Sequence, residues 1–403
     1  MDLRSQYPFW LLKDGMIRSF PSLDKDVQTE IVIMGAGITG ALMAYHLGKA
    51  GYKVVVVDRR HPGMGSSAAS TGLLQYEIDT PLRKLIRLVG EDHAVRSYAL
   101  CVKAIHVLYS IIKTIGAEVD FEFKPSFQYA SSRWDVKNLR TEYELRKQYQ
   151  LSAVEWLEAE DVKKKYGFKA PAGLLSKDGA QVNTYKLGHC LLKYCVDQFD
   201  LNVYDTTEIV KWKSAKEVVI LKTGEGRQIS ARKLIVCAGY ESGNYLPRKV
   251  EIRNSTYAII SKSLQADHFW YKDSLIWETA IPYLYMRSTN DHRILLGGRD
   301  DSFYNPDKRD RKLVSKAILL EKDFKKKFPH IPFQTDFAWA GTFCGTKDGL
   351  PYIGSVPQLP NTCFALGFGG NGITFSLIAS EIIRDVLEGK DNPDVPLFSF
   401  DRA

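Results

Sequence analysis

The segment Thr29–Asp58 limits what this chain can fold into more than any other part of the sequence. Residues 31–34 are all apolar, which is typical of a parallel strand buried on both faces. Three glycines follow at GxGxxG spacing: Gly35, Gly37 and Gly40. Residues 41–51 have a helical pattern, and a second apolar strand, 53–57, leads directly to Asp58. This order predicts a βαβ unit that binds a dinucleotide.

Each glycine has its own physical task in such a unit. Gly35 permits the tight turn out of the strand, Gly37 lets the backbone approach a pyrophosphate, and Gly40 lets helix and strand pack closely. Ile38 and Thr39 begin the helix, where free N–H groups and the helix dipole attract phosphate.

Asp58 ends the second strand, where a carboxylate accepts hydrogen bonds from an adenosine ribose. The acid favours a ribose without a phosphate, although Arg59 and Arg60 beside it keep a phosphorylated ribose open. The motif by itself does not distinguish NAD from FAD.

The small-residue segment after Asp58 resembles the D-amino-acid oxidase superfamily, which includes glycine oxidase and sarcosine oxidase. In that family a G-x-(S/T)-(S/T)-x-A-x-x-G-x-L stretch passes beneath a flavin. The matching residues are Gly65, Ser66, Ser67, Ala69, Gly72, Leu73 and Leu74. Hydroxyls there would serve phosphate and ribityl oxygens, and small side chains would let the backbone lie against a flat ring. The resemblance therefore implies FAD.

The likeness recurs in two later parts of the chain. The strand-rich stretch 201–239 resembles the family's meander, which implies backbone near the adenine at Glu208 and Ile209 and a strand that closes on the nucleotide at Ala238 and Gly239. Residues 339–376 are similar to the end of glycine oxidase, where a glycine-rich turn opens a helix facing the pyrimidine edge of the flavin. The matching residues are Gly370, Asn371, Gly372, Ile373 and Thr374.

The resemblance predicts an α/β fold with a Rossmann-like FAD-binding domain and a second, α+β substrate domain on a mixed, largely antiparallel sheet. We expect the FAD-binding domain to take residues 28–85, 151–248 and 335–403, and the substrate domain to take 86–150 and 249–334. Residues 1–27 would form an N-terminal arm, whose aromatic residues resemble the leading arm of the γ-glutamylputrescine oxidoreductase branch.

Tyr283 stands where glycine oxidase has a substrate-facing tyrosine, and Tyr285 shares its strand face. Amino-acid oxidases hold the substrate carboxylate with an arginine, whose planar fork bonds two oxygens at once. The positions that hold carboxylate in glycine oxidase or sarcosine oxidase carry Phe343, Gly370 and Ile373 here. A simple free amino acid is therefore a poor candidate substrate. Arg299, or Arg287, is the candidate for a charge supplied from the roof of the pocket.

The resemblance implies oxidation of a C–H next to an amine nitrogen, by hydride transfer to flavin N5, giving an imine. Non-covalent FAD is expected, because Gly341 occupies the position of the cysteine that attaches flavin in some relatives. Three alternatives remain: a 2-hydroxy-acid or glycerol-phosphate dehydrogenase that passes electrons to a quinone or carrier, an FAD-bound partner in RNA modification, and a plain NAD dehydrogenase.

Composition narrows the partners. The 403 residues carry a net charge of +8 with no long Lys/Arg block, which argues against nucleic-acid binding and leaves a small-molecule substrate, an amine, as the expected partner. The six cysteines include no CxxC pair, so no metal site is predicted. Residues 1–20 lack the apolar core of a secretory signal, and no apolar run approaches the roughly 20 residues that span a bilayer. We expect a cytoplasmic protein.

Overall fold

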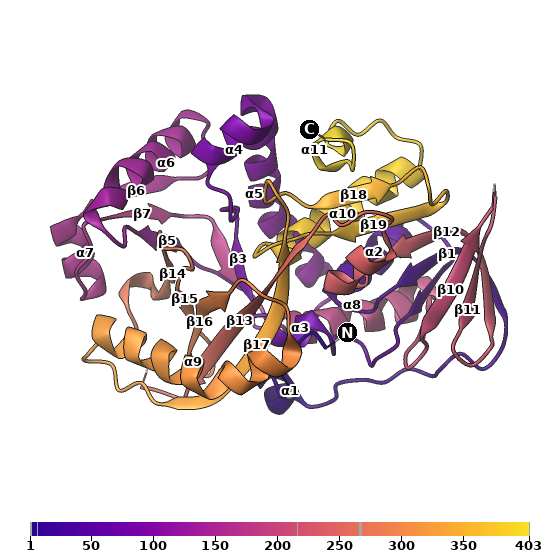
Figure 1. Cartoon of the computed structure of the whole chain (residues 1–403), viewed down its shortest axis with the longest axis horizontal. Coiled ribbons are helices and arrows are strands. Elements are labelled where there is room, and N and C mark those ends of the chain that lie inside the picture. Colours follow the sequence, from indigo (N-terminus) through magenta and orange to yellow (C-terminus); the bar gives the residue numbers. More distant parts are fainter. Residues whose placement is uncertain (1, 6, 216, 266–267, 403) are drawn as a thin grey trace.

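Two eight-stranded sheets organise the computed structural model, which describes residues 2–5, 7–215, 217–265 and 268–402. The first sheet has the order β10-β11-β12-β1-β2-β9, with β19 paired to β12 and β18 to β19 (Figure 1). Its strands are β1 (Val27–Met34), β2 (Val54–Val57), β9 (Asn202–Tyr204), β10 (Ile209–Ser214), β11 (Val219–Thr223), β12 (Gln228–Val236), β18 (Tyr352–Ser355) and β19 (Thr362–Leu366).

The centre of this sheet is parallel, as the βαβ pattern predicts. β1 lies between β2 and β12, with Ile33 opposite both Val56 and Ile235. Residues 31–34 are buried because both faces of β1 are covered. Ile31 and Ile33 belong to the core cluster formed with the helices, and Val32 and Met34 belong to a second cluster on the other face of the sheet. The helices in contact with one another here are α2 (Ile38–Lys49), α5 (Glu91–Thr114), α8 (Thr184–Phe199) and α10 (Gly372–Leu387).

The second sheet is mixed and largely antiparallel, in the order β17-β13-β16-β15-β14-β5-β7-β6. Among its pairs only β14 and β5 run parallel. Its strands are β5 (Ser126–Tyr129), β6 (Val154–Glu158), β7 (Ala172–Ser176), β13 (Ile252–Ser261), β14 (Leu275–Glu278), β15 (Tyr285–Ser288), β16 (Ile294–Asp301) and β17 (Thr335–Gly345). The fold class expected from the sequence is confirmed.

The sheets divide the chain differently from the expected domain boundaries at two places. β6 and β7 fall within 151–248, and β17 within 335–403, yet all three strands pair in the second sheet. The reason is non-local pairing: β17 runs beside β13 over ten registered positions, from Ile252 opposite Gly345 to Ser261 opposite Thr335. In the opposite sense α5, within 86–150, packs against α10 of the nucleotide layer.

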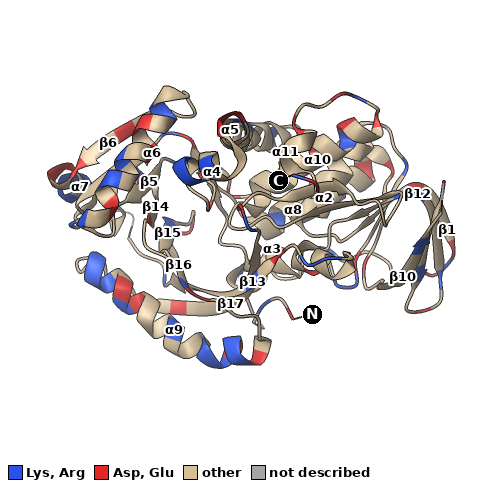
Figure 2. Cartoon of the chain, turned by 45° about the horizontal axis from the view of Figure 1, so that its top comes forward, with Lys and Arg blue, Asp and Glu red and all other residues tan. Residues whose placement is uncertain are grey.

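Shorter elements complete the fold. A three-stranded sheet joins β3 (Leu73–Gln75), β8 (Gly179–Gln181) and β4 (Glu122–Phe123) between the two layers. The remaining α-helices are α1 (Phe9–Asp14), α3 (Ser66–Ala69), α4 (Leu82–Val89), α6 (Val136–Gln148), α7 (Ala159–Tyr166), α9 (Pro306–Lys327) and α11 (Val395–Phe398). Charged residues gather on outer helices such as α6, α7 and α9, whereas the strands are mostly uncharged (Figure 2).

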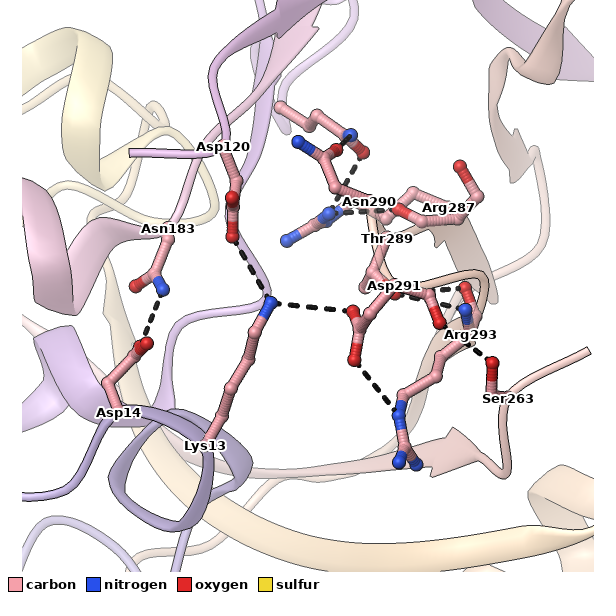
Figure 3. A network of polar contacts seen from close by, with 12 residues as sticks. Lys13, Asp14, Asp120, Asn183, Ser263, Arg287, Thr289, Asn290, Asp291 and Arg293 are labelled. Atoms are coloured by element: carbon pink, nitrogen blue, oxygen red, sulfur yellow. Dashed lines mark hydrogen bonds and ion pairs between the residues drawn. The ribbon is translucent and has the colours of Figure 1, made fainter. Parts of the chain in front are cut away.

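The N-terminal arm connects the two layers. Arg4 forms a bridge with Gly341 of β17, and Trp10 of α1 is almost fully buried. Lys13, at the end of α1, forms ion pairs with Asp120 at 3.3 Å and with Asp291 at 3.4 Å (Figure 3). The Trp10 indole N–H also donates to the carbonyl of Ser70, so the arm packs against the segment 65–74.

α5 is the one helix in the described part of the chain with the length and apolar character to cross a membrane. Half of its most apolar window is buried inside the fold. Tyr98, Cys101 and Ile105 on its inner face are fully buried, so the apolar residues of α5 form the core against α10.

Candidate active site

Two adjoining cavities follow the carboxyl ends of the parallel strands. The space between their lining atoms, open solvent at the mouths included, is about 730 Å³ in one and about 1190 Å³ in the other. They share five lining residues: Ile38, Thr39, Ser66, Ser67 and Gly239. The smaller one is called here the nucleotide cavity and the larger one the substrate cavity. They therefore lie side by side between β2 and the face of the second sheet.

The glycines of the first motif shape the turn at the nucleotide cavity. Gly35 has φ +116°, and a Cβ there would lie 2.3 Å from the carbonyl oxygen of Cys237. A Cβ at Gly40 would lie 1.8 Å from the carbonyl oxygen of Gly35, so the helix could not approach the turn as it does. Gly37 precedes the first residue of α2 and leaves the helix N-terminus open to the cavity.

Asp58 lines the nucleotide cavity and holds its loops in place. Its Oδ2 accepts the N–H of Ala36 at 2.7 Å, and its Oδ1 accepts the N–H of Arg60 at 2.8 Å. Burial raises the pKa of Asp58, and these two backbone donors oppose that rise. A carboxylate oxygen accepts more than one hydrogen bond, so the ribose hydroxyls predicted from the sequence still have an acceptor here.

Glu241 is a residue of this cavity that the sequence analysis missed. It forms ion pairs with Arg59 and with Arg60, the latter at 3.0 Å. Burial would raise the pKa of Glu241, but the hydrogen bond and charge of Arg60 outweigh burial and lower it. Arg59 and Arg60 share the carboxylate of Glu241, and Arg59 also forms an ion pair with Glu208 at 3.4 Å, so the unphosphorylated ribose is favoured over a 2′-phosphate.

The segment 65–74 forms the wall shared by the two cavities. Ser67 Oγ accepts the N–H of Ile38 at 3.0 Å, and the indole N–H groups of Trp10 and Trp339 hold the carbonyls of Ser70 and Ala69 from behind, at 2.7 and 2.9 Å. The small side chains are thereby left to face the cavity. The sequence-predicted cofactor residues that line one cavity or both are Gly35, Gly37, Ile38, Thr39, Asp58, Arg59, Gly65, Ser66, Ser67, Ala69, Gly72, Leu73, Glu208, Ile209, Ala238, Gly239, Gly341, Gly370, Gly372 and Ile373.

The N-terminus of α10 opens into the substrate cavity. Asn371 does not cap it, because its side-chain amide donates to the carbonyls of Gln75 and Glu77 at 3.0 and 2.9 Å. A Cβ at Gly372 would meet no atom within 4 Å. Open space at glycines and a free helix end form a cradle that fits a flat, charge-accepting ring. Four predicted residues lie behind the lining: Gly40, Leu74, Asn371 and Thr374.

The far wall of the substrate cavity comes from the second sheet. Tyr283 and Phe343 line it, as predicted, together with Tyr285 and Trp339. The rings of Tyr283 and Tyr285 lie 5.8 Å apart. The Tyr283 hydroxyl donates to Asp79 Oδ1 at 2.9 Å. Asp79 Oδ2 in turn accepts the backbone N–H of Gly370 at 2.7 Å, which joins the roof to the N-terminal turn of α10.

Arg299, in contrast, does not lie in the substrate cavity. Its guanidinium binds Asp323 of α9 at 2.7 and 2.6 Å, and it lines a separate cavity on the outer side of the second sheet. The cause is a bulge in β16, where Gly298 and Arg299 have φ +139° and +57° and the register with β13 shifts. A bulge re-aims the side chains around it. Here it turns Arg299 outward and Asp300 into the cavity.

Asp300 is thus the charged residue that the sequence analysis overlooked. It is the one charged side chain among the described residues that line the substrate cavity, and no Lys, Arg or His lines it. Its Oδ1 is buried and has no hydrogen-bond partner among the described residues. Burial raises the pKa of Asp300 to about 6. The pair Gly297–Gly298 just before it was the sequence signal for a bulge.

Comparison with known proteins agrees with this geometry. The family described as "DAO: FAD dependent oxidoreductase" matches residues 30–386. Gamma-glutamylputrescine oxidoreductase of Escherichia coli is 24% identical over 92% of this chain and 86% of its own length. Glycine oxidase of Bacillus subtilis is also 24% identical, over 90% of this chain and 94% of its own. The structure of glycine oxidase from Geobacillus kaustophilus superposes with a TM-score of 0.77 at 17% identity, covering 94% of this chain and 99% of that one.

Proposed function

The chain belongs to the DAO family of FAD-dependent oxidoreductases, and from that premise we propose that it oxidises a small amine at the carbon next to nitrogen. The observation that carries the proposal is the cavity pair: the nucleotide cavity adjoins a substrate cavity that lacks a cationic side chain among its described lining residues. Such a chamber suits an amine and does not suit the carboxylate of an amino acid, a 2-hydroxy acid or a phosphate ester.

The residues of this chain position FAD and exclude water. FAD, when bound, supplies the acceptor for the hydride that leaves the substrate carbon. Asp58 and the turn at Gly35 would hold the adenosine part, and segment 65–74 would support the ring system. The N-terminal turn of α10 would place positive dipole near the ring, which favours the charge the ring gains. The substrate nitrogen provides the electron pair of the new C=N bond, and water then hydrolyses the imine.

We propose that FAD is bound without a covalent link. Cys344, the cysteine nearest Gly341 in sequence, is fully buried and does not line the substrate cavity. Burial raises the pKa of its thiol, which disfavours the thiolate. Acid precipitation of the yellow protein should leave the flavin in the supernatant. Flavin that stays in the protein pellet would contradict the proposal.

The test of the reaction is anaerobic bleaching of the bound flavin. Small primary and N-methyl amines should bleach it, whereas lactate, glycolate and glycerol phosphate should leave it yellow. Bleaching by a hydroxy acid or glycerol phosphate, with no response to amines, would contradict amine oxidation and favour a 2-hydroxy-acid or glycerol-phosphate dehydrogenase. A purified protein that contains NAD and no flavin would contradict both.

A further inference from the structure

The substrate cavity has a pronounced charge asymmetry that the family assignment does not explain. Its one charged lining residue among those described is an acid, Asp300. Tyr283, which also lines the cavity, donates its hydroxyl to a second acid, Asp79, which is exposed and lies outside the lining. An uncompensated carboxylate in a low-dielectric cavity is costly unless a cation or a donor meets it. The cavity itself, and not the acidic pair, identifies this as a binding site.

Asp79 also lies beside Gly370, the position at which the resemblance to glycine oxidase would place a carboxylate-binding arginine. A Cβ at Gly370 would lie 2.8 Å from Asp79 Oδ1 and 3.2 Å from the Tyr283 hydroxyl. An arginine side chain at position 370 would therefore require the Asp79 carboxylate and the Tyr283 hydroxyl to move. The hydrogen bonds from Gly370 and Tyr283 to Asp79 instead hold a negative charge at the mouth of the cavity.

Asp300 has no cation of its own at the cavity face. Two lysines of α9 pair with the next residue, Asp301: Lys312 at 3.0 Å and Lys316 at 2.9 Å. Arg299 is taken by Asp323. The bulge thus directs three consecutive charged side chains to two sides of the sheet. Arg299 and Asp301 pair with α9, and Asp300 faces the cavity, where its Oδ1 has no hydrogen-bond partner among the described residues.

We propose that Asp300 is a specificity-determining residue that makes the cavity select substrates bearing an ammonium group and no carboxylate, with the Asp79–Tyr283 pair strengthening that preference. This inference rests on the proposed amine oxidation and specifies its substrate class. A cationic group in the cavity would pair with Asp300 at its Oδ1, which has no hydrogen-bond partner among the described residues, whereas a carboxylate would meet a like charge.

The experiment compares three probes of similar length: diaminobutane, butylamine and γ-aminobutyrate, which differ in the charge of the group opposite the amine. The holoenzyme should be reduced most efficiently by diaminobutane and least by γ-aminobutyrate. Asp300→Asn should lower the efficiency with diaminobutane by about tenfold or more and flatten the order. Asp301→Asn is the matched control, because its carboxylate faces α9, and it should keep the order of the wild type.

A binding measurement separates this inference from the proposed reaction. Tetramethylammonium and propionate are inert, so perturbation of the flavin absorbance reports their dissociation constants even if no probe is oxidised. Tetramethylammonium should bind the wild type more tightly than propionate does, and Asp300→Asn should weaken it by about tenfold. If Asp300→Asn does not retain FAD, Asp79→Asn should weaken the same ion by about threefold. Equal or tighter binding of propionate by the wild type would overturn the inference, as would unchanged binding of tetramethylammonium in the variants.

Discussion

The two ends of the cavity pair are built in opposite ways. At the nucleotide cavity the backbone shapes the site, and the charged side chains have protein partners: Asp58 accepts two backbone amides, and Arg59 and Arg60 pair with Glu241, with Glu208 as a further partner of Arg59. At the substrate cavity the work is done by side chains, and Asp300 keeps a buried oxygen without a partner. The charged groups of the nucleotide cavity are therefore paired without a ligand, whereas Asp300 Oδ1 in the substrate cavity is left to pair with a ligand.

This difference indicates which substitutions should separate the two functions of the molecule. Changes at the nucleotide end should alter flavin content and stability while leaving the preference among substrates intact. Changes at the substrate end should alter preference while the protein stays yellow. Each prediction below tests one side of that division.

Gly40→Ala should have the largest effect. The added Cβ would lie 1.8 Å from the carbonyl oxygen of Gly35, a backbone atom that cannot rotate away, so α2 and the turn must separate. We expect purified protein with little or no FAD and a destabilisation of roughly 3 kcal/mol or more. Flavin absorbance per chain and urea unfolding measure both.

Gly188→Ala in α8 is the control for this substitution. It lies within a helix, and a Cβ there would meet no atom within 4 Å. Alanine should therefore stabilise the protein by up to about 1 kcal/mol and leave FAD in place. Wild-type flavin content in Gly40→Ala would show that the turn is not as tightly packed as described.

Asp58→Ala should weaken FAD binding without changing substrate preference. It removes the acceptor of two backbone amides and the acceptor offered to the ribose. We expect the dissociation constant of FAD to rise about tenfold to a hundredfold. Reconstitution of the apoprotein with FAD gives the constant, and the relative rates with diaminobutane and butylamine should equal those of the wild type.

The nucleotide end was predictable from sequence because its determinants are local. A strand, three glycines, a helix and an acid lie within thirty positions, between Thr29 and Asp58, and the resulting geometry needs little from the rest of the chain. The segment 65–74 and the turn at Gly370 were instead identified through the family resemblance. Glu241 was missed, since its pairing with Arg59 and Arg60 joins residues about 180 positions apart.

The substrate end was predictable only in part, because one bulge in β16 determines which side chains face the cavity. In a regular strand Arg299 and Asp301 share a face and Asp300 lies on the other, but periodicity does not say which face is the cavity. The pairing of β13 with β16 and β17 sets which face lies toward the cavity, and the positive φ of Gly298 and Arg299 changes the local orientation. The family resemblance pointed to Tyr283 and Phe343, and both line the substrate cavity.

Titration of Asp300 should change the catalytic efficiency and the free energy of unfolding in opposite directions as pH rises. Burial, aided by Asp79 and Asp301 and opposed by Thr256 and Lys316, raises its pKa from 3.8 to about 6. The efficiency with diaminobutane should therefore rise as pH increases through about 6. Folding prefers the protonated form, so its stabilising effect is full below pH 3.8 and is lost as pH rises through about 6.

Asp300→Asn provides the measurement, since it removes the titrating group. At pH well above the Asp300 pKa the variant should be more stable than the wild type by roughly 1–3 kcal/mol, while at low pH the two should converge. Urea unfolding at both pH values checks the sign. A variant that is less stable at the higher pH would show that the carboxylate already has a partner.

Tyr283→Phe should have a smaller effect confined to the substrate end. It removes the hydrogen bond to Asp79 but keeps the ring that packs near Tyr285. We expect KM for diaminobutane to rise by about two- to fivefold with flavin content unchanged. A loss of FAD in this variant would place Tyr283 on the nucleotide side of the division.

Arg299→Ala should have the smallest effect. Its guanidinium pairs with Asp323 at the outer surface, where an exposed ion pair contributes about 0–1 kcal/mol. KM for amines and for amino acids should match the wild type. A large rise in KM for a carboxylate-bearing substrate would restore Arg299 as a ligand and contradict the orientation of the bulge.

The central claim is that this protein oxidises the carbon next to an amine nitrogen with bound FAD. Its most direct test is the anaerobic rate of flavin bleaching by diaminobutane, compared with the same compound deuterated at the carbons next to nitrogen. Breaking of that C–H bond predicts complete bleaching that is clearly slower with deuterium. No bleaching by any amine, together with bleaching by a hydroxy acid, would contradict the account.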